Sequence, residues 1–162
     1  MRHALELDQF ILHYQPQFNA ADQRLTGVEA LLRWQHPVRG LVPPDDFIPV
    51  LEELGLVEQV GDCVLLQACW QFNDWQSRGL AVGKMSVNLS ARQFNDAQLA
   101  KRFAAILHDS NMSPAALELE LTESILMGNA EQTLHILADL KQLGLSLSVD
   151  DFGTGYSSLN YL

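Results

Sequence analysis

Apolar and polar residues alternate with two different periods along this chain. Five short segments follow a period of two, in which neighbouring side chains point to opposite faces, as in a β-strand. They are residues 10–18, 25–34, 82–89, 117–122 and 145–150. Four longer segments follow a helical period, and they are residues 45–54, 56–78, 91–109 and 129–143. This succession of strands and helices predicts an α/β fold with a mostly parallel sheet.

Residues at the predicted element ends support this division and set one strand direction. Ser90 can cap the helix that follows the third strand, and Gly79 and Gly144 stand just after predicted helix ends. The first two strands are joined only by residues 19–24. A parallel crossover needs a dozen or more residues, so we expect the first strand to run antiparallel to the second.

The predicted strands have one apolar and one polar face. In residues 117–122 three leucines point one way, whereas Glu118, Glu120 and Thr122 point the other way. Parallel strands covered by helices on both faces would instead read as continuous apolar runs. A closed barrel explains the pattern, because leucines would face the outer helices while small and acidic residues line the interior. A half-solvated sheet with a polar outer face is the alternative.

Composition is that of a folded domain, since 48% of the 162 residues are hydrophobic and 19% are charged. No repeat or linker interrupts the pattern, so we expect one domain over residues 1–162. No apolar run reaches the ~18 residues of a membrane span. We therefore expect a cytoplasmic chain without membrane contact of its own, or the cytoplasmic domain of a membrane-anchored parent.

The net charge bears on the kind of partner, and the cysteines bear on the redox state of the chain. The net charge of −10 argues against a nucleic-acid polymer as partner, because such surfaces need Lys and Arg. Cys63 and Cys69 lie six residues apart in a predicted helix, on different faces and out of disulfide reach. We expect both to be reduced thiols.

Oxygen-bearing side chains recur on the polar face of the predicted strands. They are Glu29, Asn88, Glu120 and Asp150, joined by Asp151 one step further. Converging carboxylates raise one another's pKa unless a cation neutralises them. Ligands of this kind suit Mg²⁺ or Mn²⁺ rather than Zn²⁺. Adjacent aspartates can serve two ions a few ångströms apart, as two-metal phosphoesterases require.

Six motifs in order give the chain a specific resemblance. Glu29-Ala30-Leu31 lies within 27–34, and the other five motifs occupy 14–16, 47–56, 86–90, 118–124 and 150–155. Together they resemble the EAL family of cyclic di-GMP phosphodiesterases. The resemblance implies a modified TIM (β/α)8 barrel with an antiparallel first strand, of which about the first five strands are present. The chain would then be the amino-terminal two-thirds of an EAL domain, without the last three barrel strands.

The resemblance also implies a function and a role for each matched residue. The reaction would be hydrolysis of cyclic di-GMP to linear pGpG by water activated at two Mg²⁺ or Mn²⁺ ions, with Ca²⁺ expected to inhibit. The metal ligands would be Glu29, Asn88, Glu120, Asp150 and Asp151, the substrate contacts Gln15, Leu31 and Arg33, and the residue that steadies the catalytic loop Glu123. A homodimer would form through residues 151–159 and the following helix.

Several alternatives remain open from the residues alone. Glu123 could instead cap a helix, and Gln15 and Arg33 could be ordinary hydrogen-bonding residues at a barrel mouth. The chain stops at Leu162, before the family's remaining catalytic positions, so it is a fragment, the first part of a longer protein, or one half of a swapped pair. The rival function is a catalytically incomplete module that binds cyclic di-GMP or a protein partner. Sensory or GGDEF domains are possible in the parent protein.

Overall fold

Six strands form one sheet in a computed structural model of the chain, which describes residues 1–122, 125 and 130–150. The strands are β1 (Phe10–Phe18), β2 (Leu25–His36), β3 (Gly40–Val42), β4 (Lys84–Leu89), β5 (Leu117–Thr122) and β6 (Ser146–Asp150). The helices are α1 (Arg2–Glu6), α2 (Pro44–Glu53), α3 (Val57–Ser77), α4 (Ala91–Phe94), α5 (Leu99–Ser110), the 3₁₀ turn η1 (Pro114–Ala116) and α7 (Ala130–Gln142).

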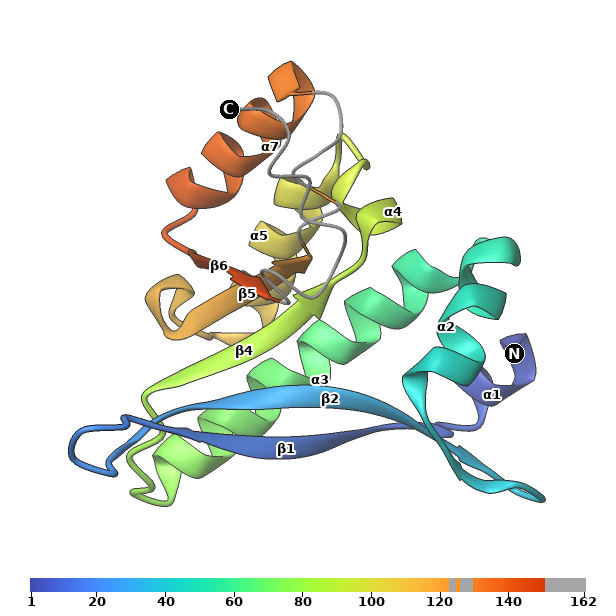
Figure 1. The fold of residues 1–162 in the computed structure, drawn as a ribbon, viewed down its shortest axis with the longest axis horizontal. Helices are drawn as coiled ribbons and strands as arrows, with labels where there is room; N and C mark the ends of the chain where they lie inside the picture. The colour runs from blue at the N-terminus through green and yellow to red at the C-terminus, as the bar shows by residue number, and fades with distance from the viewer. Residues whose placement is uncertain (123–124, 126–129, 151–162) are drawn as a thin grey trace.

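The sheet has the order β1-β2-β4-β5-β6, with β3 paired to β2 on the side (Figure 1). β1 and β2 form an antiparallel hairpin, as predicted from their short connection. β2, β4, β5 and β6 run parallel to one another, each joined to the next by a helical segment. The mixed sheet and its antiparallel first strand agree with the α/β barrel expected from the sequence.

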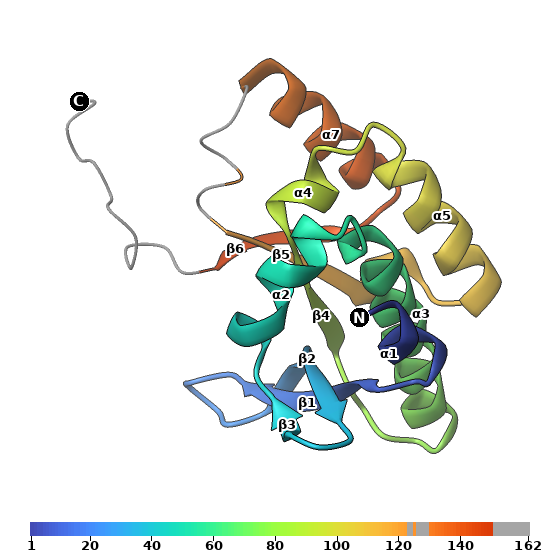
Figure 2. The same ribbon diagram turned by 90° about the vertical axis from the view of Figure 1, so that its right-hand side faces the viewer.

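Helices cover the apolar face of the sheet. Figure 2 shows α3, α5 and α7 along one side of the strands, and α3 contacts β1, β4 and α5. The three leucines of β5 are at most 1% exposed, so this face forms the core. Each such side chain contributes about 1.5–3 kcal/mol by leaving water. The predicted division into apolar and polar faces is therefore confirmed for β5.

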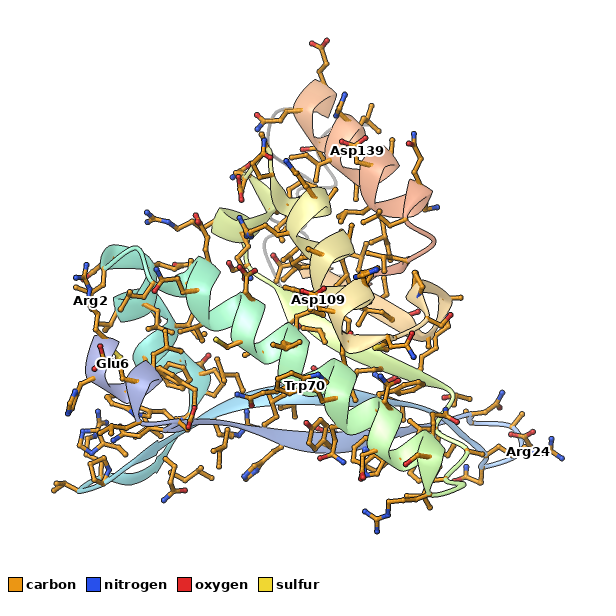
Figure 3. All side chains as sticks on the ribbon, turned by 180° about the vertical axis from the view of Figure 1, so that it is seen from behind. Arg2, Glu6, Arg24, Trp70, Asp109 and Asp139 are labelled. Atoms are coloured by element: carbon orange, nitrogen blue, oxygen red, sulfur yellow. The ribbon has the colours of Figure 1, made fainter. Side chains whose placement is uncertain are left out.

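The outer side of the long helix α3 faces solvent at one aromatic residue. Trp70 is 56% exposed, and Figure 3 shows it from behind the sheet.

Tyr14 of β1 packs edge-on against Trp75 of α3, with ring centroids 4.9 Å apart. Burial raises the pKa of the Tyr14 hydroxyl to about 12. This motif residue thus anchors β1 to α3 and has no place on the polar face.

One predicted helix, residues 91–109, is wrong as a single element, because the structure breaks it into α4 and α5. Ser90 does cap α4, and Gln93 completes a reciprocal capping box with it. The helix ends at Asn95, where the Asp96 carboxylate accepts a hydrogen bond from the backbone N–H of Gln98 at 2.9 Å. A short acidic side chain that bonds its own backbone competes with helix continuation.

Three short elements were not predicted, namely α1, β3 and η1, the longest of which has five residues. The short strand β3 pairs with Trp34, Gln35 and His36 at the carboxyl end of β2, and the last two of these lie beyond the predicted end of that strand. Pieces this short carry too few residues to show a period. These three elements do not change the order or direction of the predicted strands.

Both cysteines are free thiols, as predicted. Cys69 is fully buried in α3, and desolvation raises the pKa of its thiol to about 11. Burial also raises the pKa of Cys63, helped by the nearby charges of Asp62 and Asp8. Neither thiol is therefore activated as a nucleophile. Within the described part of the chain, no helix combines the length and apolar character needed to cross a bilayer.

Candidate metal and phosphodiester site

The polar face of the sheet collects one set of side chains from every main strand. Strand pairing places Gln15 opposite Glu29, Glu29 beside Ser86, and Asn88 beside Glu120. Residues at alternating positions of neighbouring strands share a face, so these side chains all lie on the side away from the helices. Glu120 is only 8% exposed although it belongs to this polar face. The face is therefore partly enclosed.

Three of the five predicted metal ligands come together on this face. The Asn88 amide donates a hydrogen bond to Glu29 Oε1 at 2.7 Å, which joins β4 to β2. Glu120 stands directly beside Asn88 on β5. The backbone of Asp150 lies in β6 beside Thr122, one alternation further towards the carboxyl ends of the strands. Glu123 and Asp151 lie outside the described residues, as do residues 151–159 of the predicted dimer contact.

A residue that the sequence analysis missed completes this cluster. Gln17 of β1 donates a hydrogen bond from Nε2 to Glu120 Oε1 at 3.2 Å. The signal that could have found it is period two, because Gln17 shares the face of Gln15. Each of the two described carboxylates in the predicted ligand set therefore accepts a hydrogen bond from a neutral amide, Glu29 from Asn88 and Glu120 from Gln17.

At the amino ends of the strands, a lysine side chain lies among the polar groups of the same face. Lys84 Nζ lies 3.1 Å from Glu118 Oε2 and donates to Ser146 Oγ at 2.9 Å. These residues stand at the start of β4, β5 and β6. The protein itself thus supplies a positive charge for the carboxylate at this end.

The predicted substrate residues share the polar face at β1 and β2. Gln15 is exposed directly opposite Glu29, and Leu31 is partly exposed opposite His13. Arg33 continues the alternation from Glu29, and its guanidinium donates to the Leu32 carbonyl oxygen at 2.8 Å. All three therefore line the approach to the carboxylate cluster from β1 and β2.

The donor set fits a hard divalent cation. Two carboxylates and an amide offer oxygen atoms from three adjacent strands, which suits Mg²⁺ or Mn²⁺. Among the described residues, the buried hydroxyl oxygens of Ser86 and Ser148 have no hydrogen-bond partner, and they stand beside Glu29 and Glu120. A face with such polar atoms suits a charged, hydrated occupant better than an apolar one.

No group of three or more His, Cys, Asp and Glu side chains that could hold a metal occurs within the described ranges. The predicted ligand set contains two described carboxylates, Glu29 and Glu120, and the amide Asn88. It also includes Asp150, for which only the backbone is described, and Asp151, which lies outside the described residues.

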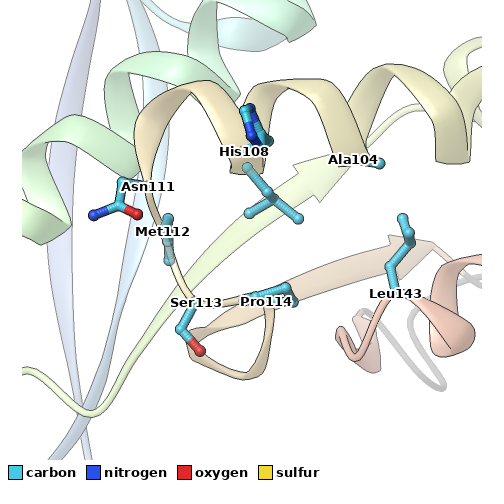
Figure 4. Close-up of a pocket in the computed structure, with 8 residues that line it drawn as sticks. Ala104, His108, Asn111, Met112, Ser113, Pro114 and Leu143 are labelled. Atoms are coloured by element: carbon cyan, nitrogen blue, oxygen red, sulfur yellow. The ribbon is translucent and has the colours of Figure 1, made fainter.

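Two pockets differ in their relation to this cluster. The pocket in Figure 4 lies between the end of α5 and Leu143, with Asn111, Ser113 and Pro114 on its rim. It sits at the amino ends of β5 and β6, where barrel enzymes rarely place their chemistry. A second pocket is mainly apolar, and Leu31, Asn88 and Thr122 form part of its lining. Most of this lining comes from α2, α3 and the helix-covered face of β2 and β4, and the pocket reaches the predicted ligands at Asn88.

Comparisons with known proteins agree on one family. The family model described as the EAL domain matches residues 1–162. The chain is 47% identical over 162 residues to the bifunctional diguanylate cyclase/cyclic di-GMP phosphodiesterase MucR of Pseudomonas aeruginosa, covering 100% of this chain and 24% of that protein. It is 41% identical to the cyclic di-GMP phosphodiesterase PdeR of Escherichia coli, again covering 100% of this chain and 24% of the relative.

A solved structure described as the PaMucR phosphodiesterase in complex with c-di-GMP has the same fold. It superposes with a TM-score of 0.91 at 47% identity, covering 99% of this chain and 65% of that one. The chain thus spans about a quarter of the length of these curated relatives and about two-thirds of the matched structure.

Proposed function

This chain belongs to the EAL domain family, and we propose that it forms part of a metal-dependent phosphodiesterase that hydrolyses cyclic di-GMP to linear pGpG. The observation that carries the proposal is the convergence of Glu29, Asn88 and Glu120 on a partly enclosed polar face. The names of MucR and PdeR supply the substrate, because both are described as cyclic di-GMP phosphodiesterases.

Glu29, Asn88 and Glu120 would hold the first metal ion, with Asp150 as a further ligand. Asp150 and Asp151 would contribute to a second ion. When bound, Mg²⁺ or Mn²⁺ would supply charge stabilisation at the phosphate and a lowered pKa for water. The Asn88 hydrogen bond holds Glu29 Oε1 in a defined direction, so this carboxylate is oriented before any cation arrives.

The substrate would lie along the β1 and β2 part of the polar face. Arg33 offers a guanidinium, which binds phosphate oxygens through a planar pair of donors. Leu31 borders the mainly apolar pocket, which suits the flat face of a guanine base. Gln15, exposed opposite Glu29, would hydrogen-bond the substrate near the scissile phosphate. Glu123 would steady the loop after Asp151.

The test is hydrolysis of cyclic di-GMP by the purified full chain in Mg²⁺, with product identified by chromatography against a pGpG standard. We expect linear pGpG to form, and we expect Glu29→Gln to remove the activity. Glu6→Gln, at an exposed position of α1, is the matched control and should keep it.

Two results would contradict this proposal in different ways. Tight binding of cyclic di-GMP by calorimetry without any pGpG would instead support the receptor or scaffold function. Retention of full activity in Glu29→Gln would show that hydrolysis does not use the metal site.

A further inference from the structure

Gln17 connects two strands that are not neighbours in the sheet. β1 and β5 are separated by β2 and β4, yet the Gln17 side chain reaches Glu120 at 3.2 Å. Strands spaced about 4.8 Å apart put β1 and β5 roughly 14 Å from each other along the sheet surface. A hydrogen bond across that span requires the sheet to curve, so that the two side chains meet above its concave face.

The path of this side chain depends on the residue opposite it. Gln17 pairs with Gly27 of β2, which presents no side chain on the polar face. A Cβ added at Gly27 would lie 3.0 Å from Gln17 Oε1 and 3.1 Å from the carbonyl oxygen of Lys84. The first contact involves the far end of a flexible side chain, but the second involves backbone. A larger residue at 27 would therefore push Gln17 away from its present path.

The hydrogen bond acts on a carboxylate that is almost fully enclosed. Glu120 is 8% exposed, so the direction of its oxygens is set largely by protein groups rather than by bulk water. The amide of Gln17 donates to Oε1 and adds no charge. Asn88 makes the equivalent contact with Glu29. A hydrogen bond of this kind helps to fix the orientation of the carboxylate.

We propose that Gln17 is a positioning residue for the metal site, which orients Glu120 as a ligand without touching the cation. The proposal rests on the proposed function, because it requires Glu120 to bind a divalent metal. Partners that orient metal ligands typically change metal affinity or activity by 10–100-fold when removed. Gln17 is predicted to act in the same range through metal affinity.

The experiment uses the full chain and has two readouts. Calorimetry gives the Kd for Mn²⁺, and electron paramagnetic resonance gives the spectrum of the bound Mn²⁺. Gln17→Leu removes the donor at similar size, and Gln17→Asn keeps the amide but withdraws it by one methylene. We expect both to raise the Kd for Mn²⁺ by about 10–100-fold. We also expect hydrolysis at limiting Mn²⁺ to fall and to recover at saturating Mn²⁺. Gln59→Leu, at an exposed position of α3, is the control and should leave the Kd within about twofold.

A purely structural role predicts a different result. It would lower the melting temperature of Gln17→Leu while the folded protein keeps the wild-type Kd and spectrum, and that result overturns the proposal. If Gln17→Leu does not fold, Gln17→Asn decides by the same two readouts. Failure of the wild-type protein to bind Mn²⁺ would refute the proposed function and this inference together. Wild-type binding with an unchanged Kd in the variants would refute only the role of Gln17.

Discussion

The two ends of the polar face stabilise their carboxylates in different ways. At the amino ends of the strands Glu118 has Lys84 at 3.1 Å, so the protein provides both partners of an ion pair. At the other end Glu29 and Glu120 accept hydrogen bonds from Asn88 and Gln17, which orient the oxygens without adding positive charge. The first arrangement is complete within the chain. The second fixes the direction of carboxylate oxygens through neutral amides, as the orienting partners of metal ligands do.

The largest effect is expected at the amide-supported end. Glu29→Gln removes a carboxylate from the proposed metal site, and its loss should exceed the ~100-fold cost of removing an orienting partner. Hydrolysis of cyclic di-GMP should therefore fall by more than about 100-fold. The melting temperature without metal should stay the same or rise, because one of several converging negative charges is gone. A large fall in melting temperature would show that Glu29 is mainly a structural residue.

A smaller effect should appear on the apolar side of the sheet, away from both ends. The pKa of Cys69 is raised from 9 to about 11 by burial, so the folded protein favours the neutral thiol. Unfolding then releases a proton above pH 9, and stability present below that pH is lost progressively up to about pH 11. The unfolding free energy, measured in urea, should fall by about 2 kcal/mol over this window.

The matched variant for this pH dependence is Cys69→Ala, which should flatten the slope between pH 9 and 10. Tyr14, whose pKa is raised to about 12, still contributes at higher pH by the same argument. An unchanged slope in Cys69→Ala would mean that another group controls alkaline unfolding.

The smallest effect is expected at the cation-supported end. Lys84→Met removes the ion pair with Glu118, but both side chains are partly exposed, at 43% and 23%. Solvent screening limits the loss to about 1 kcal/mol of unfolding free energy. The Kd for Mn²⁺ should stay within about twofold of wild type. A large change in that Kd would show that Lys84 and the predicted metal ligands act as one electrostatic unit.

Much of this architecture follows from period-two patterning. The apolar and polar faces of β5, and the meeting of Glu29, Asn88 and Glu120, are predictable because alternating residues on neighbouring strands share a face. Period two also places Gln17 on the polar face with Gln15, but it does not predict which residue Gln17 contacts. Its hydrogen bond to Glu120 depends on the curvature of the sheet and on the missing side chain of Gly27, and neither is a local property of β1.

The hydrophobic pattern also could not predict the break between α4 and α5. Residues 91–109 keep a helical period, but Asp96 bonds the backbone of Gln98, and a contact between single groups outweighs the period. The predicted roles of Glu123 and Asp151 stay predictions, because they depend on residues outside the described part of the chain. Sequence patterning therefore places side chains on a face, whereas contacts across the sheet decide how they are oriented.

Gly61 in α3 has a consequence that reaches the candidate site. A methyl group at this position would collide with the side chain of Gln93, which packs against the helix there. Gln93 belongs to the capping box with Ser90, only two residues after Asn88. The contact between Gly61 of α3 and the Gln93 side chain therefore helps to fix the carboxyl end of β4. A larger residue at 61 would therefore displace the Gln93 side chain and disturb the cap that begins α4 directly after β4.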